Sequence, residues 1–315
     1  MTLCNPNTTF KNVSNITSDF LLNILESNMK NFLDWSFLHI GAWFDVARPD
    51  HNLYGGNYHY KLNLVEDPSY NNGQVWQTVR KDWVWETGIS YESTSPTPIS
   101  GVYVNNSLIT SGYTINYPLG QIIFDSAINK SSSVELNYSY RFIQTYRAND
   151  APWFNILQYN TFNTDSKDIT QTSEGEWSIG SYKRVQMPCV IIEAVPRSRS
   201  LPYELGSGGL IFEQDIMLYV LAENKNDRNK ILDIFRYQQD SVIYLYNTNN
   251  VAKDDKYPLD YNGNLKNDAL MYPDLVENYK WRKCWFKNIN LVELSTILPT
   301  FHSGAARVTA EIIYP

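Results

Sequence analysis

The chain has 315 residues, of which 43% are hydrophobic and 14% aromatic, and its formal net charge at pH 7 is −7. This length accommodates two domains, or one domain with a large insertion, and the apolar content supports a packed core. The negative charge, with no basic cluster larger than Arg197-Ser198-Arg199, argues against nucleic acid as a direct partner.

Residues 1–48 predict an N-terminal arm followed by a helix. Residues 1–16 are polar, and Thr17-Ser18-Asp19 offers several N-caps. An apolar stripe at four-residue steps predicts an amphipathic helix over residues 19–34. The stripe consists of Leu21, Leu25, Met29 and Leu33, widened by Leu22 and Phe32. The apolar segment 37–47 fits either a strand or a second short element.

Residues 49–150 predict an inserted β-rich domain, because Gly, Asn, Ser, Pro and aromatic residues dominate and the apolar period drops to two. Trp83 and Trp85 are two residues apart, which places them on one face of a strand. Asn105-Asn106 predicts a tight turn. Pro118-Leu119-Gly120 predicts the next one, after a strand with Tyr113, Ile115 and Tyr117 on one face. Short strands at this spacing indicate an antiparallel β-sandwich or a barrel-like fold.

Residues 151–315 predict an α+β domain. A short helix is expected within 151–163, a buried strand within 187–198 and a longer strand within 208–223, with a loop that includes Pro196 between the two strands. A helix follows, with Asn226 or Asp227 as its cap. Its inward residues are predicted to be Ile231, Leu232, Ile234 and Phe235. Three more strands complete the unit, and we expect the N-terminal helix to pack on their sheet, so that 49–150 is an insertion in an α+β fold.

The sequence predicts no catalytic, cofactor-binding or metal-binding residues. His51 and His59 flank a Gly-Gly turn without a matching carboxylate, so ordinary histidines are favoured over metal ligands. Ser207-Gly208-Gly209 lacks the Lys-Ser/Thr of a phosphate loop. The segment 260–264 alternates oxygen-bearing side chains, but Leu265 and Met271 stand where a calcium loop needs Gly and Glu, so a turn is favoured.

Two pairs of carboxylates make a glycosidase an alternative function. Glu174 with Glu176, and Asp254 with Asp255, are close in sequence, and a glycosidase needs two carboxylates across a sugar. Both pairs fall in polar segments, which favours solvated loop charge. A carbohydrate-binding or adhesive module, with the aromatic β-block as its contact surface, is a second alternative.

The cysteines and the N-terminus bear on location. Cys4, Cys189 and Cys284 are widely separated and lack metal-ligand spacing, which favours buried single thiols. The first residues lack the basic start and apolar run of a signal peptide. No apolar run approaches the roughly 20 residues of a membrane span. We therefore expect a soluble protein made in the cytoplasm, with no membrane partner.

Two segments resemble virion proteins of tailed bacteriophages. The stretch MPCVIIEAV, a loop, and LIFEQDIMLYVLAENKNDRNKILDIFRYQQDSVIYLYN, followed by two strands, resembles the tail terminator proteins. The stretch VYVNNSLITSGYTINYPLGQIIFD, followed by SSVELNYSYRF, is similar to a β-module that recurs in phage virion proteins. The resemblance implies a sheet flanked by helices, with the β-module as a large insertion.

The resemblance also implies a non-enzymatic structural role in the virion. It implies a ring of six copies at the neck that ends the tail tube and joins it to the head connector. The expected partners are other copies of the chain, the tail tube protein, head–tail connector proteins and, in contractile tails, the sheath. Another connector, collar or sheath role is the alternative within the virion. The candidate interface residues are Trp83, Trp85, Tyr113, Tyr117, Arg197, Arg199 and Tyr203.

Overall fold

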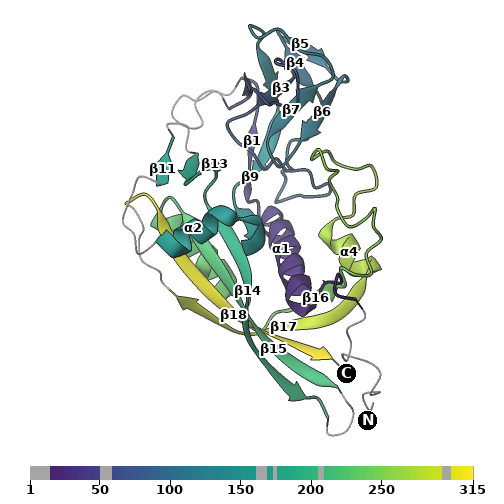
Figure 1. The fold of residues 1–315 in the computed structure, drawn as a ribbon, viewed down its shortest axis with the longest axis vertical. Coiled ribbons are helices and arrows are strands. Elements are labelled where there is room, and N and C mark those ends of the chain that lie inside the picture. Colours follow the sequence, from purple (N-terminus) through teal and green to yellow (C-terminus); the bar gives the residue numbers. More distant parts are fainter. Residues whose placement is uncertain are drawn as a thin grey trace.

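The computed structural model describes residues 15–49, 59–160, 169–172, 176–204, 209–292 and 299–314. It is a mixed α+β fold, mostly β, with antiparallel sheets curled into half-barrels and few helices (Figure 1). No helix in these ranges combines the length and apolar character needed to cross a membrane. The predictions for most of the N-terminal arm, Cys4, His51, Glu174 and Ser207-Gly208 lie outside the described residues.

A six-stranded sheet forms the lower unit in Figure 1. In spatial order its strands are β10 (Gln144–Arg147), β14 (Cys189–Pro202), β15 (Leu210–Ala222), β18 (His302–Tyr314), β17 (Lys280–Val292) and β16 (Val242–Tyr246). The β10–β14 pair is parallel and the other pairs are antiparallel. The four central strands are much longer than the two outer ones, so the outer strands cover only part of their neighbours.

Helices α1 (Leu21–His39) and α3 (Lys225–Arg236) pack on one face of this sheet. The predicted stripe is confirmed, because Leu25, Met29 and Leu33 are buried against it. The helix is longer than expected because Phe37 continues the stripe. The cap prediction was wrong: Phe20 is the N-cap and makes no side-chain cap bond, whereas Asp19 accepts a hydrogen bond from Thr248.

The start of α3 also differs in detail from expectation. Asn224 is the N-cap, and its side chain accepts a 2.8 Å hydrogen bond from the backbone N–H of Asp227. The predicted cap Asp227 therefore lies in the first turn, where its negative charge favours the helix N-terminus. The inward face is confirmed, with Ile231, Leu232 and Phe235 buried and Ile234 packed beside them.

The opposite face of the sheet is covered by three elements. They are the short helix η1 (Ala148–Asp150), helix α2 (Pro152–Asn160) and a small sheet of β11 (Ile169–Gln171), β12 (Trp177–Ile179) and β13 (Tyr182–Val185). Strand β14 is therefore buried on both sides: Cys189 and Ile191 face this layer, while Val190 and Ile192 face α1 and α3. This explains why its sequence is continuously apolar.

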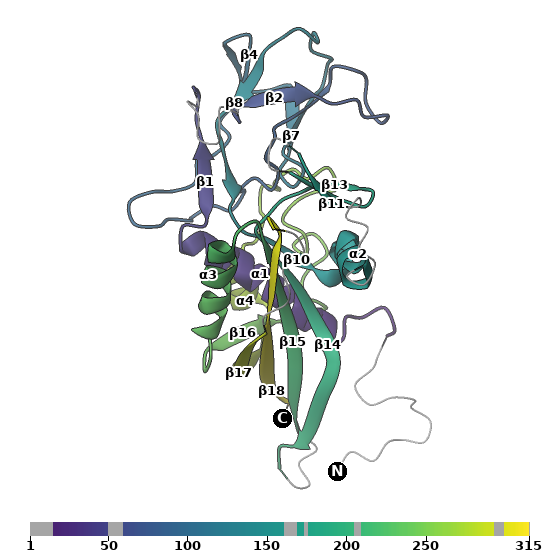
Figure 2. The same ribbon diagram turned by 90° about the vertical axis from the view of Figure 1, so that its left-hand side faces the viewer.

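The inserted domain, at the top of Figure 2, is a curled sheet. It has seven strands in the order β5-β4-β8-β2-β3-β7-β6. Its strands are β2 (Lys61–Leu64), β3 (Val75–Gln77), β4 (Val102–Val104), β5 (Ser107–Ile109), β6 (Tyr113–Asn116), β7 (Gln121–Phe124) and β8 (Val134–Leu136). The separate pair β1 (Trp43–Val46) and β9 (Tyr138–Arg141) leads the chain in and out. Because β10 belongs to the six-stranded sheet, the insertion runs from β1 to β9 rather than over 49–150.

Both predicted turns of the insertion are confirmed. Asn105 and Asn106 have φ of 49° and 67°, as a two-residue hairpin between β4 and β5 requires. Gly120 has φ of 63° before β7, and an added Cβ would lie 2.6 Å from the carbonyl oxygen of Arg80. Glycine is needed there on both grounds.

A buried amide fixes α1 to the edge of the sheet. Asn28 is fully buried, and its Nδ2 donates 2.9 Å to the carbonyl of Tyr246 while its Oδ1 accepts 2.8 Å from the N–H of Tyr246. The same Nδ2 also donates to the carbonyl of Ile24. Asn28 thus supplies the hydrogen bonds that another strand would give to the end of β16.

Replacing this amide tests its structural role. We expect Asn28→Ala to lower the free energy of unfolding by about 1–3 kcal/mol for each backbone group of Tyr246 left unpaired. Urea unfolding followed by circular dichroism measures the loss. The matched control is Asn23→Ala, at an exposed position of the same helix. Equal stability of the two variants would show that the amide pairing contributes little.

Candidate functional site

A large cleft lies between the two units and has a volume of about 1070 Å³. It is bounded by α1, by the segment between β16 and α4 (Tyr272–Asn278), and by residues of the inserted domain around Trp85. Its wall combines aromatic side chains with acidic and basic groups. A cleft of this size with a few convergent polar groups is the usual form of a ligand site.

A buried ion pair forms part of this wall. Arg141, at the end of β9, places Nη2 2.6 Å and 2.7 Å from the two carboxylate oxygens of Glu86. The guanidinium carbon lies 5.9 Å from the ring centre of Trp85. Nearby, Lys30 of α1 lies 2.7 Å from Asp34, and Asp34 also accepts a hydrogen bond from Thr145 of β10. These contacts join the helix, the sheet and the insertion.

Burial controls the protonation of the acidic groups. It raises the pKa of Asp82 and of Glu86, and the positive charge of Arg141 opposes both shifts. Burial alone would lower the pKa of Arg141, but Glu86, Asp34 and Asp82 together raise it. The guanidinium therefore stays charged, and it donates hydrogen bonds to Glu86, while burial disfavours the charged form of both carboxyls.

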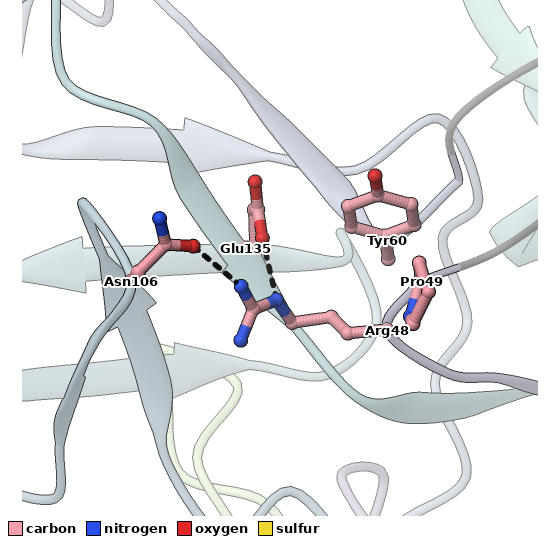
Figure 3. A pocket seen from close by; sticks show the side chains of 5 residues that line it. All are labelled: Arg48, Pro49, Tyr60, Asn106 and Glu135. Carbon is pink, nitrogen blue, oxygen red and sulfur yellow. Dashed lines mark hydrogen bonds and ion pairs between the residues drawn. The ribbon is translucent and has the colours of Figure 1, made fainter.

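A smaller pocket of about 320 Å³ lies on the inserted domain (Figure 3). Arg48 donates to Glu135 at 2.5 Å and to Asn106 at 2.9 Å, and its guanidinium stacks 4.1 Å from the ring centre of Tyr103. Its charge is thus already paired with Glu135. These contacts fix the segment after β1 to β8 and to the β4–β5 turn, which is a structural role.

The structure separates the two tryptophans that were expected on one strand face. Trp83 is only 1% exposed and packs on Tyr138 and Tyr117, with ring centres 5.0 Å and 6.5 Å away. It belongs to the core of the inserted domain and offers no contact surface. Trp85 lies beyond any strand and lines the large cleft. The one-face prediction was wrong because the chain leaves the sheet after β3 and makes only an isolated bridge at Trp83.

The other interface candidates fall into two groups. Tyr113 and Tyr117 are half-buried and pack against the core of the insertion, so their face is mainly internal. Arg197, Arg199 and Tyr203 lie on the exposed far end of β14 and its loop. The side chain of Arg197 is 76% exposed and lies 3.7 Å from Asp215.

The remaining sequence motifs have structural partners. Glu176 pairs with Arg184 at 3.0 Å, and Asp255 accepts a 2.7 Å hydrogen bond from Tyr279. One described carboxylate of each suggested pair is therefore already engaged by another side chain of the protein. Among the described residues no group of three or more His, Cys, Asp or Glu is arranged to hold a metal ion.

The predicted turn at 260–264 is confirmed and has a further contact. Asp260 accepts hydrogen bonds from the N–H groups of Asn262 and Asn264, and Gly263 has φ of 84°. Asn264 in turn accepts a 2.6 Å hydrogen bond from the N–H of Ile115 in β6. The loop thereby covers the outer edge of the insertion's sheet.

The six-stranded sheet has an open stretch on each side. Strand β10 pairs only with residues 189–192 of β14, and β16 pairs only with residues 280–285 of β17. Within the described ranges, no strand pairs with the outer side of β14 beyond Glu193 or of β17 beyond Phe286. Helix α1 covers the start of the open stretch of β14, because Glu26 accepts a hydrogen bond from the backbone N–H of Ala194 at 2.8 Å. Among the residues that the structure describes, the rest of both edges has no strand partner.

Sequence reasoning missed the cleft residues. Asp34, the neighbours Asp82 and Glu86, and Arg141 come from three separate parts of the sequence and form no motif. The available signal was local: Arg141 follows the alternating strand YSY, and Asp34 sits within an apolar helix face. A charge in such a position is often paired when buried.

Comparison with protein-family models gave no match to this chain. Comparison with curated proteins gave no match either.

The cysteines yield a prediction about reactivity. Burial raises the pKa of Cys284 to about 12 and raises that of Cys189 further, so both are almost wholly uncharged thiols near neutral pH. Because the thiolate is the reactive form, we expect neither to react with Ellman's reagent in the folded protein. The measurement uses a Cys4→Ser background, and unfolding in urea should release both thiols. Rapid reaction before unfolding would contradict their burial.

Proposed function

We propose that the chain is a non-enzymatic structural protein of a tailed-phage virion, which forms a ring at the neck, ends the tail tube and joins it to the head connector. The observation that carries the proposal is the six-stranded sheet with an open stretch on each of its two outer sides. The resemblance to tail terminator proteins supplies the place in the virion and the number of six copies.

The two open stretches suit head-to-tail association. The open part of β14 lies near its end at Pro202, whereas that of β17 lies near Val292, which pairs with Ala305 at the other end of β18. The edges therefore lie on opposite sides and at opposite ends of one sheet. Pairing one with the other joins unlike surfaces, and repeated contacts between unlike surfaces close into a ring when the rotation per copy allows.

The hydrogen-bonding direction of β14 supports pairing along its outer edge. The N–H of Tyr203 donates 3.0 Å to the carbonyl of Gly209 on the β15 side. Since N–H groups alternate in direction along a strand, those of Arg199 and Leu201 also point to β15, and those of Ser198 and Ser200 point outward. Pro202, which has no N–H, occupies an outward position, as edge strands allow.

The end of the six-stranded sheet that contains residues 198–202 of β14, with their partners in β15 and β18, has an exposed face that offers further contacts. Cross-strand neighbours form an apolar row of Leu201, Ile211 and Ile313 beside a charged row of Arg199, Glu213 and Glu311. Lys287 of β17 lies 2.5 Å from Glu213 and 3.1 Å from Glu311. Alternating apolar and charged rows are suited to a specific protein contact. On the edge of β14, Pro196 and the register shift next to it limit unspecific pairing with other strands.

A proline on the outer edge of β14 tests the role of that edge. We expect the wild type to form an oligomer and Ser200→Pro to dissociate into monomers, because the substitution removes an outward donor and leaves the β15 pairing intact. Light scattering after size-exclusion chromatography measures the mass. Ser200→Ala is the matched control and should assemble as the wild type does. A wild type that stays monomeric at its highest soluble concentration would refute the proposal.

Mixing two defective variants tests the head-to-tail arrangement. Ser200→Pro lacks a working β14 edge, and the double variant Leu291→Glu/Val292→Glu places charge on the open β17 edge, where both side chains are exposed. Each alone should be monomeric. Mixed together they should form a one-to-one dimer through the two intact edges. Absence of the heterodimer, with homodimers of either variant instead, would indicate a contact between like edges.

A further inference from the structure

Part of the six-stranded sheet is covered on one face only. Helices α1 and α3 pack on one face, and α2 with the small sheet packs on the opposite face around Cys189, Ile191 and Leu221 (Figure 2). Further along the strands, the side chains on that opposite face are exposed or half-exposed. We call this stretch the uncovered face; it is formed by alternate residues of 199–201, 211–213, 311–313, 283–285 and 242–244.

Apolar side chains lie across the whole width of the uncovered face. Val242 is 53% exposed, Tyr244 37% and Ile313 43%. The half-exposed apolar members of the same face are Trp285, Ile211 and Leu201. An antiparallel sheet with one face toward water normally carries polar residues on that face. An apolar surface that crosses five strands therefore indicates a contact with another protein.

The acidic side chains of the uncovered face share one cation. Lys287 Nζ lies 2.5 Å from a carboxylate oxygen of Glu213 and 3.1 Å from one of Glu311. The two carboxylates are cross-strand neighbours in the middle of the face. A phosphate backbone laid over them would meet two negative charges balanced by a single lysine, so nucleic acid is disfavoured as a partner.

The margins of the uncovered face are cationic. At the β16 end, Lys280 Nζ and Lys283 Nζ lie 3.6 Å and 5.5 Å from the ring centre of Tyr244. Within the ranges that the structure describes, neither lysine makes an ion pair. At the β14 end, Arg199 is exposed, and its cross-strand neighbour Glu213 is the carboxylate already paired with a lysine. Apolar side chains between unpaired cations are complementary to a partner that combines apolar and acidic groups.

A helix suits this surface better than a strand or a second copy of the same face. Within a sheet the backbone N–H and C=O groups point to the neighbouring strands, so the face offers none of them to a partner strand. A helix pairs its own backbone and presents an apolar stripe, as α1 and α3 do on the other face. Two copies that met through this face would bring Lys283 of one against Lys283 or Arg199 of the other, and like charges repel.

We propose that the uncovered face binds an acidic amphipathic helix of a partner protein. The apolar stripe of the helix packs on Val242, Trp285 and Ile313, and carboxylates on its flanks reach Lys283 and Arg199. The five strands span about 19 Å at about 4.8 Å between neighbours, which a helix of about 13 residues matches at about 1.5 Å per residue. This binding goes beyond the proposed ring, because it uses side chains of the face and not the backbone groups of the open edges.

Fluorescence anisotropy with labelled peptides tests the proposal on the full chain. The probe is a helix-forming peptide of about 14 residues, with leucine along one face and glutamate on its flanks. The control peptide has lysine in place of every glutamate. We expect the acidic peptide to bind, with an affinity that falls as the salt concentration rises, and the lysine peptide not to bind.

Charge reversal on the face gives the sharpest variant. Lys280→Glu/Lys283→Glu changes two exposed side chains and should weaken binding of the acidic peptide by more than about tenfold, because like charges then meet. The matched control Lys225→Glu/Lys230→Glu makes the same change of charge at exposed positions of α3 and should bind as the wild type does. Val242→Ser removes an exposed apolar contact and should also weaken binding.

The outcomes separate this surface from the proposed ring. Ser200→Pro, which is expected to prevent assembly, should bind the acidic peptide as strongly as the wild type, so failure of the ring leaves this result unchanged. The helix proposal is overturned if the acidic peptide does not bind, if both peptides bind equally, or if Lys280→Glu/Lys283→Glu keeps full binding. Tighter binding of a DNA oligonucleotide than of the acidic peptide also overturns it. So does self-association of the wild type that Val242→Ser abolishes, since another copy then covers the face.

Discussion

The fold depends on hydrogen bonds that polar side chains of α1 make at the margins of the six-stranded sheet, where the outer strands β10 and β16 end early. Strands β10 and β16 are brief, so backbone groups near the sheet margins lie under the helix without a neighbouring strand. Asn28 pairs with the backbone of Tyr246 and Glu26 with the backbone N–H of Ala194, and Asp34 accepts a hydrogen bond from the side-chain hydroxyl of Thr145. An apolar helix would bury the same area and leave these groups unpaired, which a core tolerates poorly. The polar residues of α1 thus supply hydrogen-bond partners at the points where the outer strands stop.

The orientation of the inserted domain follows from two further contacts. Arg184 of β13 donates to the backbone carbonyls of Thr78 and Leu119, both at 2.8 Å, and so binds the insertion from the side of the small sheet. On another side, Asn264 and Gly263 accept from Ile115 and Tyr117 of the insertion. With the β1–β9 pair these contacts hold the insertion at three places, and the cleft lies between them.

The sequence predicted features set by local periodicity and failed for those set by long-range partners. The stripe of α1, the Asn105-Asn106 turn and the inward face of α3 follow from spacing alone, and all three were correct. Trp83 and Trp85 were misassigned because the alternation of aromatic residues continues past the end of β3, where hydrogen bonding stops. The sequence did not predict that Asp82 and Arg141 lie side by side, because a backbone contact between segments far apart in sequence brings them together.

The β1–β9 stem has a consequence for how this architecture varies. Val46 pairs with Tyr138, so the chain leaves the lower unit and returns to it at one point. The covalent attachment of everything between those two residues is a single pair of adjacent ends, as at sites that accept domain insertion. Exchanging the upper domain for another would therefore keep the stem in place, but it would leave Arg184 and the 260–264 loop without their present partners, so these two segments would have to change together with the domain.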